Sequence, residues 1–158
     1  MKVTVPQEFK IVQGTSPVTT NGGVTADYVS LKNAKRCTII VNLTQAVGHA
    51  TALTIEQATT VAGAGSTAIT VVVPIWLNAD CAATDTLVKQ ASAVSQAIAA
   101  TVKHHQVVFQ LDPATLADTF DCITVKASDS SQATNFVSVD YLIETKYGKA
   151  TPPTAITD

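Results

Sequence analysis

Charged and aromatic residues are scarce in this sequence. Of its 158 residues, 14% are charged and 5% aromatic, whereas 46% are hydrophobic. Threonine, serine, glutamine and asparagine supply the missing polarity, and uncharged, β-branched residues suit the half-buried surface of a sheet better than a surface helix. We therefore expect a β-rich chain, and its length fits one domain with a sizeable core.

Positive charge is also limited. Ten Lys and Arg residues stand against twelve Asp and Glu residues, and Arg36 is the single arginine. Nucleic-acid affinity comes largely from clustered cations that displace counterions, so nucleic acid is not expected as a partner. The densest basic stretch, LKNAKR at residues 31–36, is interpreted as a solvated turn.

No hydrophobic run is long enough to span a membrane. The longest run, AITVVVPIWL at residues 68–77, has about half the length that a membrane helix needs. The opening residues MKVTVPQEFK lack the apolar segment of a signal peptide. We therefore expect no membrane association, no signal peptide and synthesis in the cytoplasm.

Metal-binding and disulfide patterns are missing as well. Cys37, Cys81 and Cys122 are too far apart in sequence for a CxxC pair, a zinc ribbon or a disulfide framework. Cys37 and Cys122 lie in apolar runs and are expected to be buried. His104 and His105 are adjacent, so on a strand they point to opposite faces and would not share a metal ion.

The glycine-rich stretch TTVAGAGSTAIT, residues 59–70, is similar to a phosphate-binding loop only at first sight. No lysine follows its second glycine, and β-branched residues resume at once. We interpret it as a hairpin turn in which Gly63 and Gly65 supply positive φ angles. With no catalytic motif elsewhere, we predict no enzyme activity and no catalytic, cofactor-binding or metal-binding residue.

Strand patterns recur along the rest of the chain. Alternation or short apolar runs between turn signals mark seven segments: 25–31, 37–43, 51–59, 68–77, 105–111, 120–127 and 136–145. Such a series is typical of a sandwich or barrel. We predict an all-β fold with a single antiparallel, jelly-roll-like β-sandwich domain over residues 24–147.

Some segments are harder to assign. Residues 87–105 are rich in alanine, but their β neighbours and their serines and threonines favour strands. Asp112 and Pro113 can start a helical turn, so helix is predicted only near 112–118. The run from Ile69 to Leu77 is apolar on both faces, which predicts a core strand or a subunit interface, with Trp76 in the core.

Both ends of the chain are marked by proline. Residues 1–23 are predicted to form an extended N-terminal arm or an edge strand, and residues 148–158 an extended C-terminal tail. Such arms often dock on neighbouring subunits, although disordered termini are the simpler alternative.

Three further blocks of the sequence are NGGVTADYVSLKNA (21–34), TIEQATTVAGAGSTAITVVVPIW (54–76) and VVFQLDPATLADTFDCITV (107–125). These blocks resemble small virion proteins of tailed bacteriophages and prophages, in particular head decoration (cement) proteins. The resemblance implies a β-rich homotrimer on the capsid exterior, bound to the major capsid protein, with no cofactor. It also implies that the chain is a structural protein of the virion.

Under this hypothesis the chain acts by surface contact, and its arms add strands to neighbouring chains. The predicted contact residues are the apolar and proline residues of both arms: Val3, Val5, Phe9, Ile11, Pro152, Pro153 and Ile156. Two alternatives stay open. The chain could be a β-sandwich that binds a carbohydrate or receptor, which an exposed Trp76 beside Tyr28 or Tyr141 would favour, or a head-completion or tail subunit.

Overall fold

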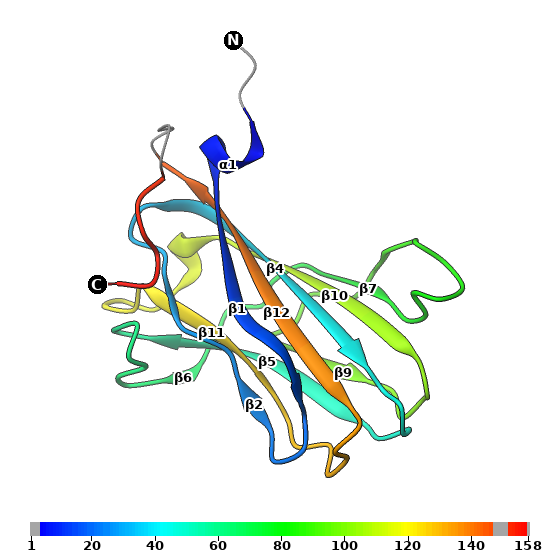
Figure 1. Cartoon of the computed structure of the whole chain (residues 1–158). Helices are drawn as coiled ribbons and strands as arrows, with labels where there is room; N and C mark the ends of the chain where they lie inside the picture. The colour runs from blue at the N-terminus through cyan, green and yellow to red at the C-terminus, as the bar shows by residue number, and fades with distance from the viewer. Residues whose placement is uncertain (1–3, 147–151, 158) are drawn as a thin grey trace.

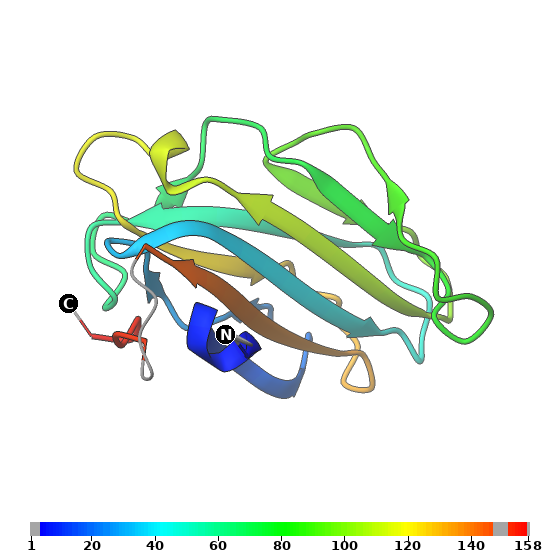
Figure 2. The same cartoon turned by 90° about the horizontal axis from the view of Figure 1, so that it is seen from above.

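Two antiparallel sheets stack face to face in the computed structural model, which describes residues 4–146 and 152–157. Figure 1 shows β1, β12 and β4 of one sheet in front of β11 and β5 of the other. The predicted fold class, an all-β antiparallel sandwich, is confirmed. Figure 2 shows α1 and the C-terminal segment toward one end of the sandwich, and the loop between β7 and β8 toward the other.

Sheet A has six strands. In spatial order they are β1 (Phe9–Thr19), β12 (Phe136–Thr145), β4 (Ala34–Thr44), β10 (His104–Leu111), β7 (Ile75–Asn78) and β8 (Val88–Lys89). Every neighbouring pair is antiparallel. The four long strands lie side by side at the β1 side, and the two short strands lie at the other.

Sheet B packs behind sheet A. Its spatial order is β2 (Val24–Thr25), β11 (Cys122–Ala127), β5 (Thr51–Ala58) and β6 (Thr67–Ala68); in addition, β3 (Val29–Ser30) pairs with β11 and β9 (Ser95–Ile98) pairs with β5. The chain crosses repeatedly from one sheet to the other, so most pairings join segments far apart in sequence.

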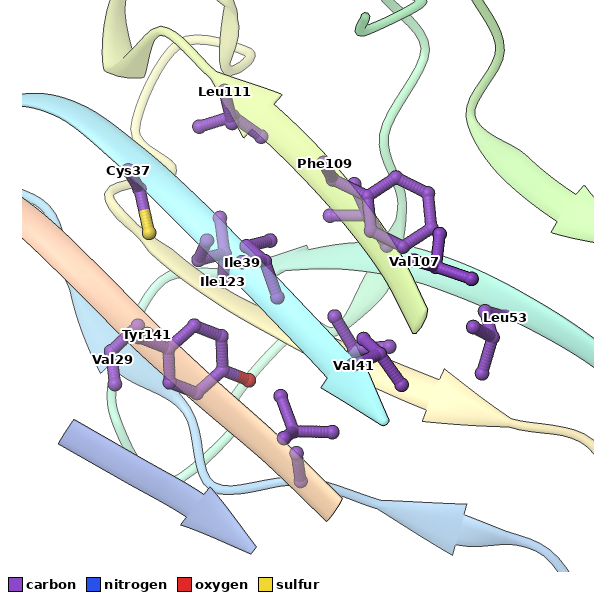
Figure 3. Packing of buried hydrophobic residues seen from close by; sticks show 14 of the residues in the cluster. Val29, Cys37, Ile39, Val41, Leu53, Val107, Phe109, Leu111, Ile123 and Tyr141 are labelled. Carbon is purple, nitrogen blue, oxygen red and sulfur yellow. The ribbon is translucent and has the colours of Figure 1, made fainter. Parts of the chain in front are cut away.

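Alternation along each strand builds the core between the sheets. In β4 the side chains of Ile39 and Val41 are fully buried, whereas Ile40 between them points outward and is partly exposed. Figure 3 shows inward residues of both sheets packed together, among them Phe109 from sheet A and Ile123 from sheet B. This alternation of buried and outward side chains follows from the two-residue repeat of a β-strand.

The run at residues 68–77 is not one strand, so that prediction is wrong. β6 of sheet B ends at Ala68 and β7 of sheet A begins at Ile75, and the residues between them cross from one sheet to the other. Pro74 has no backbone N–H for a ladder, which favours a break at this point. Val71 and Val72 on the crossover are 42% and 56% exposed.

The helix prediction is partly right. Residues 113–115 form the short 3-10 helix η1 (Pro113–Thr115), whose Ala114 N–H donates to the Asp112 carboxylate at 2.9 Å. Residues 87–105 contain strands and no helix, as predicted. A second short helix, α1 (Val5–Glu8), lies in the segment predicted to be extended, because Gln7 caps the N–H of Thr4.

The buried cysteines are as expected. Cys37 and Cys122 are fully buried and Cys81 is exposed, and none of the three is in a disulfide. Burial raises the pKa of the Cys37 thiol, which keeps it protonated and unreactive.

Candidate interaction surface

The segment predicted as an N-terminal arm or edge strand is, from Phe9 to Thr19, the outermost strand of sheet A. β1 pairs with β12 along its length, and the register shifts after Gln13 and after Thr15. Among the described residues no strand pairs with the opposite edge of β1. Sheet A therefore ends in an eleven-residue strand with an open side, called here the β1 edge.

Gly14 fixes the path of the β1 edge. A Cβ on residue 14 would overlap the ring of Tyr141, which is fully buried. The Tyr141 hydroxyl donates to the Asp27 carbonyl at 3.1 Å, and the Asp27 N–H donates to the Gly14 carbonyl at 2.8 Å. This closed set of contacts joins β1, β12 and the segment between β2 and β3 where β1 changes register.

The predicted contact residues have unequal exposure. Val5, Ile11 and Ile156 are 54%, 56% and 57% exposed. Phe9 is partly exposed and its register with Glu144 puts it on the same outward face as Ile11, which pairs with Leu142. These residues have the exposure that a contact role requires.

The other predicted contact residues differ. Pro153 is partly exposed, Pro152 is buried, and Val3 lies outside the described residues. The Ser30 N–H donates to the Ala155 carbonyl at 2.7 Å, and Ala155 is 5% exposed within the core cluster. The C-terminal segment is therefore docked on its own domain near the start of β1, with Ile156 pointing outward.

The outward face of sheet A carries one continuous line of residues across five strands. Cross-strand register joins Asp140 to Ile40, Ile40 to Val108, Val108 to Trp76, and Trp76 to Lys89. We call these five residues the sheet A row. Its three central members are apolar and partly exposed, and its two ends have opposite charge.

Neither end of the sheet A row has an intramolecular ion-pair partner in the part of the chain that the structure describes. The ion pairs there involve Lys32, Arg36, Lys103 and Lys126. Trp76 was expected in the core. Instead Ile75 and Leu77 on either side of it pack on the core, and Trp76 points outward because strand side chains alternate.

The outward face of sheet B is polar and internally paired. Lys126 contacts the Glu56 carboxylate at 2.7 Å, the Ser66 hydroxyl donates to the same carboxylate, and the Tyr28 hydroxyl donates to Ser66 at 2.7 Å. Burial acts to raise the pKa of Glu56, but the bonds from Lys126 and Ser66 outweigh it and the pKa lies below its ordinary value. We call these four residues the sheet B network.

The glycine-rich loop is part of this polar face. It joins β5 to β6, which pair antiparallel, so the hairpin prediction is confirmed. Gly63 and Gly65 have φ angles of 80° and 65°, as the turn reading required. The ring of Tyr28 lies so close to Gly63 that a Cβ on residue 63 would be 2.7 Å from it. The sequence around the loop did not indicate this contact.

An open hollow of about 420 Å³ lies at the end of β10. Lys103 and Asp80 line it and form an ion pair at 2.9 Å, and His104 contacts Thr44 at 3.0 Å. The hydrogen bond from Lys103 lowers the pKa of Asp80. Because Lys103 and Asp80 pair with each other, their charges are not free to bind a ligand in this hollow.

The two adjacent histidines point to opposite faces, as predicted. His104 is exposed, whereas His105 is 4% exposed and points into the sandwich. Burial lowers the pKa of His105, and Lys103 lowers it further. Among residues 4–146 and 152–157, no three His, Cys, Asp or Glu side chains group closely enough to hold a metal ion.

The aromatic residues do not form a common platform. Trp76 lies on the outward face of sheet A, Tyr141 lies in the core, and Tyr28 packs on the glycine-rich loop of sheet B. The arrangement of aromatics that would favour a carbohydrate site is therefore not present among these three residues.

No protein-family model and no curated protein matches the chain. A similar solved structure is the crystal structure of the SPBc2 prophage-derived protein YomS, with 10% sequence identity and a TM-score of 0.49. The similarity covers 90% of this chain and 97% of that one. In the part of the chain that the structure describes, no helix has the length and hydropathy needed to cross a membrane.

Proposed function

We propose that this chain is a non-enzymatic structural protein of a phage virion, and that it is a decoration protein bound to the outside of the assembled head. The observation that carries the proposal is the β1 edge, an open strand that exposes Ile11, with the exposed Val5 on the adjoining helix α1. The sequence resemblance to cement proteins supports the same role.

The β1 edge suits this role because its free backbone groups can pair with an extended segment of the major capsid protein. Ile11 would add apolar contact on one side of that new strand pair. A protein that binds the assembled shell and not the free subunit stabilises the shell by mass action. The resemblance further implies three copies at each site, on the virion exterior.

Particle binding by two matched variants tests the proposal. Ile11 and Val72 are each 56% exposed, but Ile11 is on the β1 edge and Val72 is on the crossover between the sheets. We expect Ile11→Asp to lower affinity for undecorated heads about tenfold or more, and Val72→Asp to leave it unchanged. Equal binding by both variants contradicts the β1 edge as the contact.

Deletion of residues 1–8 is the second test. A longer deletion that enters Phe9–Thr19 would remove a strand of sheet A, so a loss of binding could not be told from a loss of folding.

Cryo-electron microscopy of the coated particle locates the copies. Density at threefold or quasi-threefold positions of the head supports decoration, whereas a ring at the neck or tail indicates a head-completion or tail subunit.

A further inference from the structure

The two charged residues of the sheet A row lie symmetrically about its centre. Asp140 and Lys89 lie at equal distance from Val108, since each is two strands away from β10 in the sheet. With strands about 4.8 Å apart, each charge is about 10 Å from the centre of the row. The row is thus apolar in the middle and symmetric in position, but opposite in sign at its ends.

We propose that the outward face of sheet A binds the same face of a second copy of this chain, about a two-fold axis that runs along β10. A rotation of 180° about this axis puts Asp140 of one copy over Lys89 of the other, twice per dimer. It also puts Ile40 over Trp76 and Val108 over Val108. The face is complementary to itself in both charge and apolarity.

The direction of the axis follows from the charges. A two-fold axis that runs across the strands, along the row, would stack Asp140 on Asp140 and Lys89 on Lys89, with like charges opposed. Only the axis along β10 pairs opposite charges. The ends of the sheet A row are available for this, because none of the ion pairs between described residues uses them.

The size of the face sets the expected affinity. The five strands of the sheet A row span about 19 Å and the eight residues of β10 about 26 Å, which gives about 500 Å² per copy. A standard stable interface buries about 800 Å² per partner. We therefore expect a dimer that dissociates in the micromolar range.

This inference goes beyond the proposed function and does not depend on it. β1 lies three strands from the axis, but only two strands, β7 and β8, lie on the other side of it. In the dimer no strand of the second copy therefore lies opposite β1, and the β1 edge stays open. The contact is two-fold, so the free protein is a dimer where the resemblance implies a trimer. Molar mass distinguishes these two states.

Sedimentation equilibrium and fluorescence of the full chain between about 1 and 200 μM test the dimer. Trp76 is the single tryptophan and lies within the contact, so its emission reports the interface directly. We expect the mass to rise from one to two copies and the Trp76 emission to shift to the blue over the same concentrations.

Charge exchange is the sharper test. Lys89→Glu opposes two acidic side chains at both ends of the dimer, and we expect it to weaken association about tenfold or more; Asp140→Lys does the same with basic side chains. The double variant restores opposite charges across the two-fold axis, so its association should return to within about threefold of the original. The two positions are too far apart for this rescue to occur within one copy.

A fold control accompanies these variants. Val108→Asp changes a partly exposed central residue and should leave the protein monomeric, with its circular dichroism unchanged, whereas Thr54→Asp on sheet B should leave the dimer intact. A monomer up to 200 μM, a trimer, or an association that neither Val108→Asp nor Lys89→Glu weakens would each overturn the proposal.

Discussion

The sheet B network and the sheet A row differ in whether their charged side chains have ion-pair partners within the chain. On sheet B, Glu56 has Lys126 and Ser66 as partners, and its neighbour Tyr28 supports the glycine-rich loop. On sheet A, Asp140 has no ion-pair partner among the described residues and sits beside the partly exposed Ile40. The charges of the sheet B network are paired within the chain, whereas the sheet A row has apolar residues between two charges that have no ion-pair partner among the described residues.

The two groups of charges should therefore affect different properties, the stability of the fold and the association of copies. A charge that is paired within the chain contributes to folding, and its removal should be seen in unfolding experiments. A charge without an internal partner contributes little to folding, and its removal should be seen in association instead. The predictions below compare the two faces on that basis.

The largest effect is expected at the outer edge of sheet A. Gly14→Ala forces a methyl group against the buried Tyr141 ring, which β1 can avoid only by shifting away from β12. We expect a loss of about 3 kcal/mol in the free energy of unfolding, measured with urea. Gly65→Ala on the sheet B loop is the control: its φ is positive but the space is open, so about 1 kcal/mol should be lost. Equal losses would show that Tyr141 does not constrain β1.

Isosteric neutralisation compares the faces directly. Glu56→Gln removes the charge that Lys126 pairs with, and we expect it to cost about 1 kcal/mol, because the pair is only partly shielded from solvent. Asp140→Asn removes a charge without an ion-pair partner and should change the free energy of unfolding by less than about 0.3 kcal/mol. Chemical unfolding at pH 7 measures both, and a larger cost for Asp140→Asn would reverse the assignment of the two faces.

Low pH should lower the stability of the fold through His105, which is buried between the two sheets. Because burial lowers the pKa of His105 below its unfolded value of 6.5, the folded state binds fewer protons than the unfolded state below that pH. The contribution of His105 is fully present above pH 6.5 and is lost as the pH falls toward the folded pKa. We expect wild type to lose up to about 1 kcal/mol between pH 7.5 and pH 5.5. His105→Leu should lose less over this interval, and an equal loss would assign the acid sensitivity to another group.

Much of the fold could be predicted from local pattern. The apolar run at residues 37–43 predicted the strand that lies within β4, and alternation positioned the strand at residues 136–145 with its correct bounds. Turn chemistry identified the glycine-rich hairpin and the N-cap of η1 at Asp112. These features depend on residues close in sequence, so the sequence contains the information that they need.

The features that were missed depend on contacts between distant residues. The break in the run at 68–77 follows from a crossover between sheets, and the outward position of Trp76 follows from where β7 begins. The docking of Ala155 on Ser30 joins the C-terminal segment to β3, which is far from it in sequence. The sheet A row appears only once five strands are set in register, and no sequence spacing indicates it.

Cross-linking at the centre of the sheet A row tests most directly whether two copies meet there. Stacked sheets lie about 10 Å apart, too far for a disulfide, so Val108→Cys is treated with a short bismaleimide in a Cys81→Ala background, where Cys37 and Cys122 stay buried. We predict efficient cross-linked dimer for Val108→Cys and only background for Thr54→Cys on sheet B. Equal yields at the two positions, or no dimer at residue 108, would contradict the account.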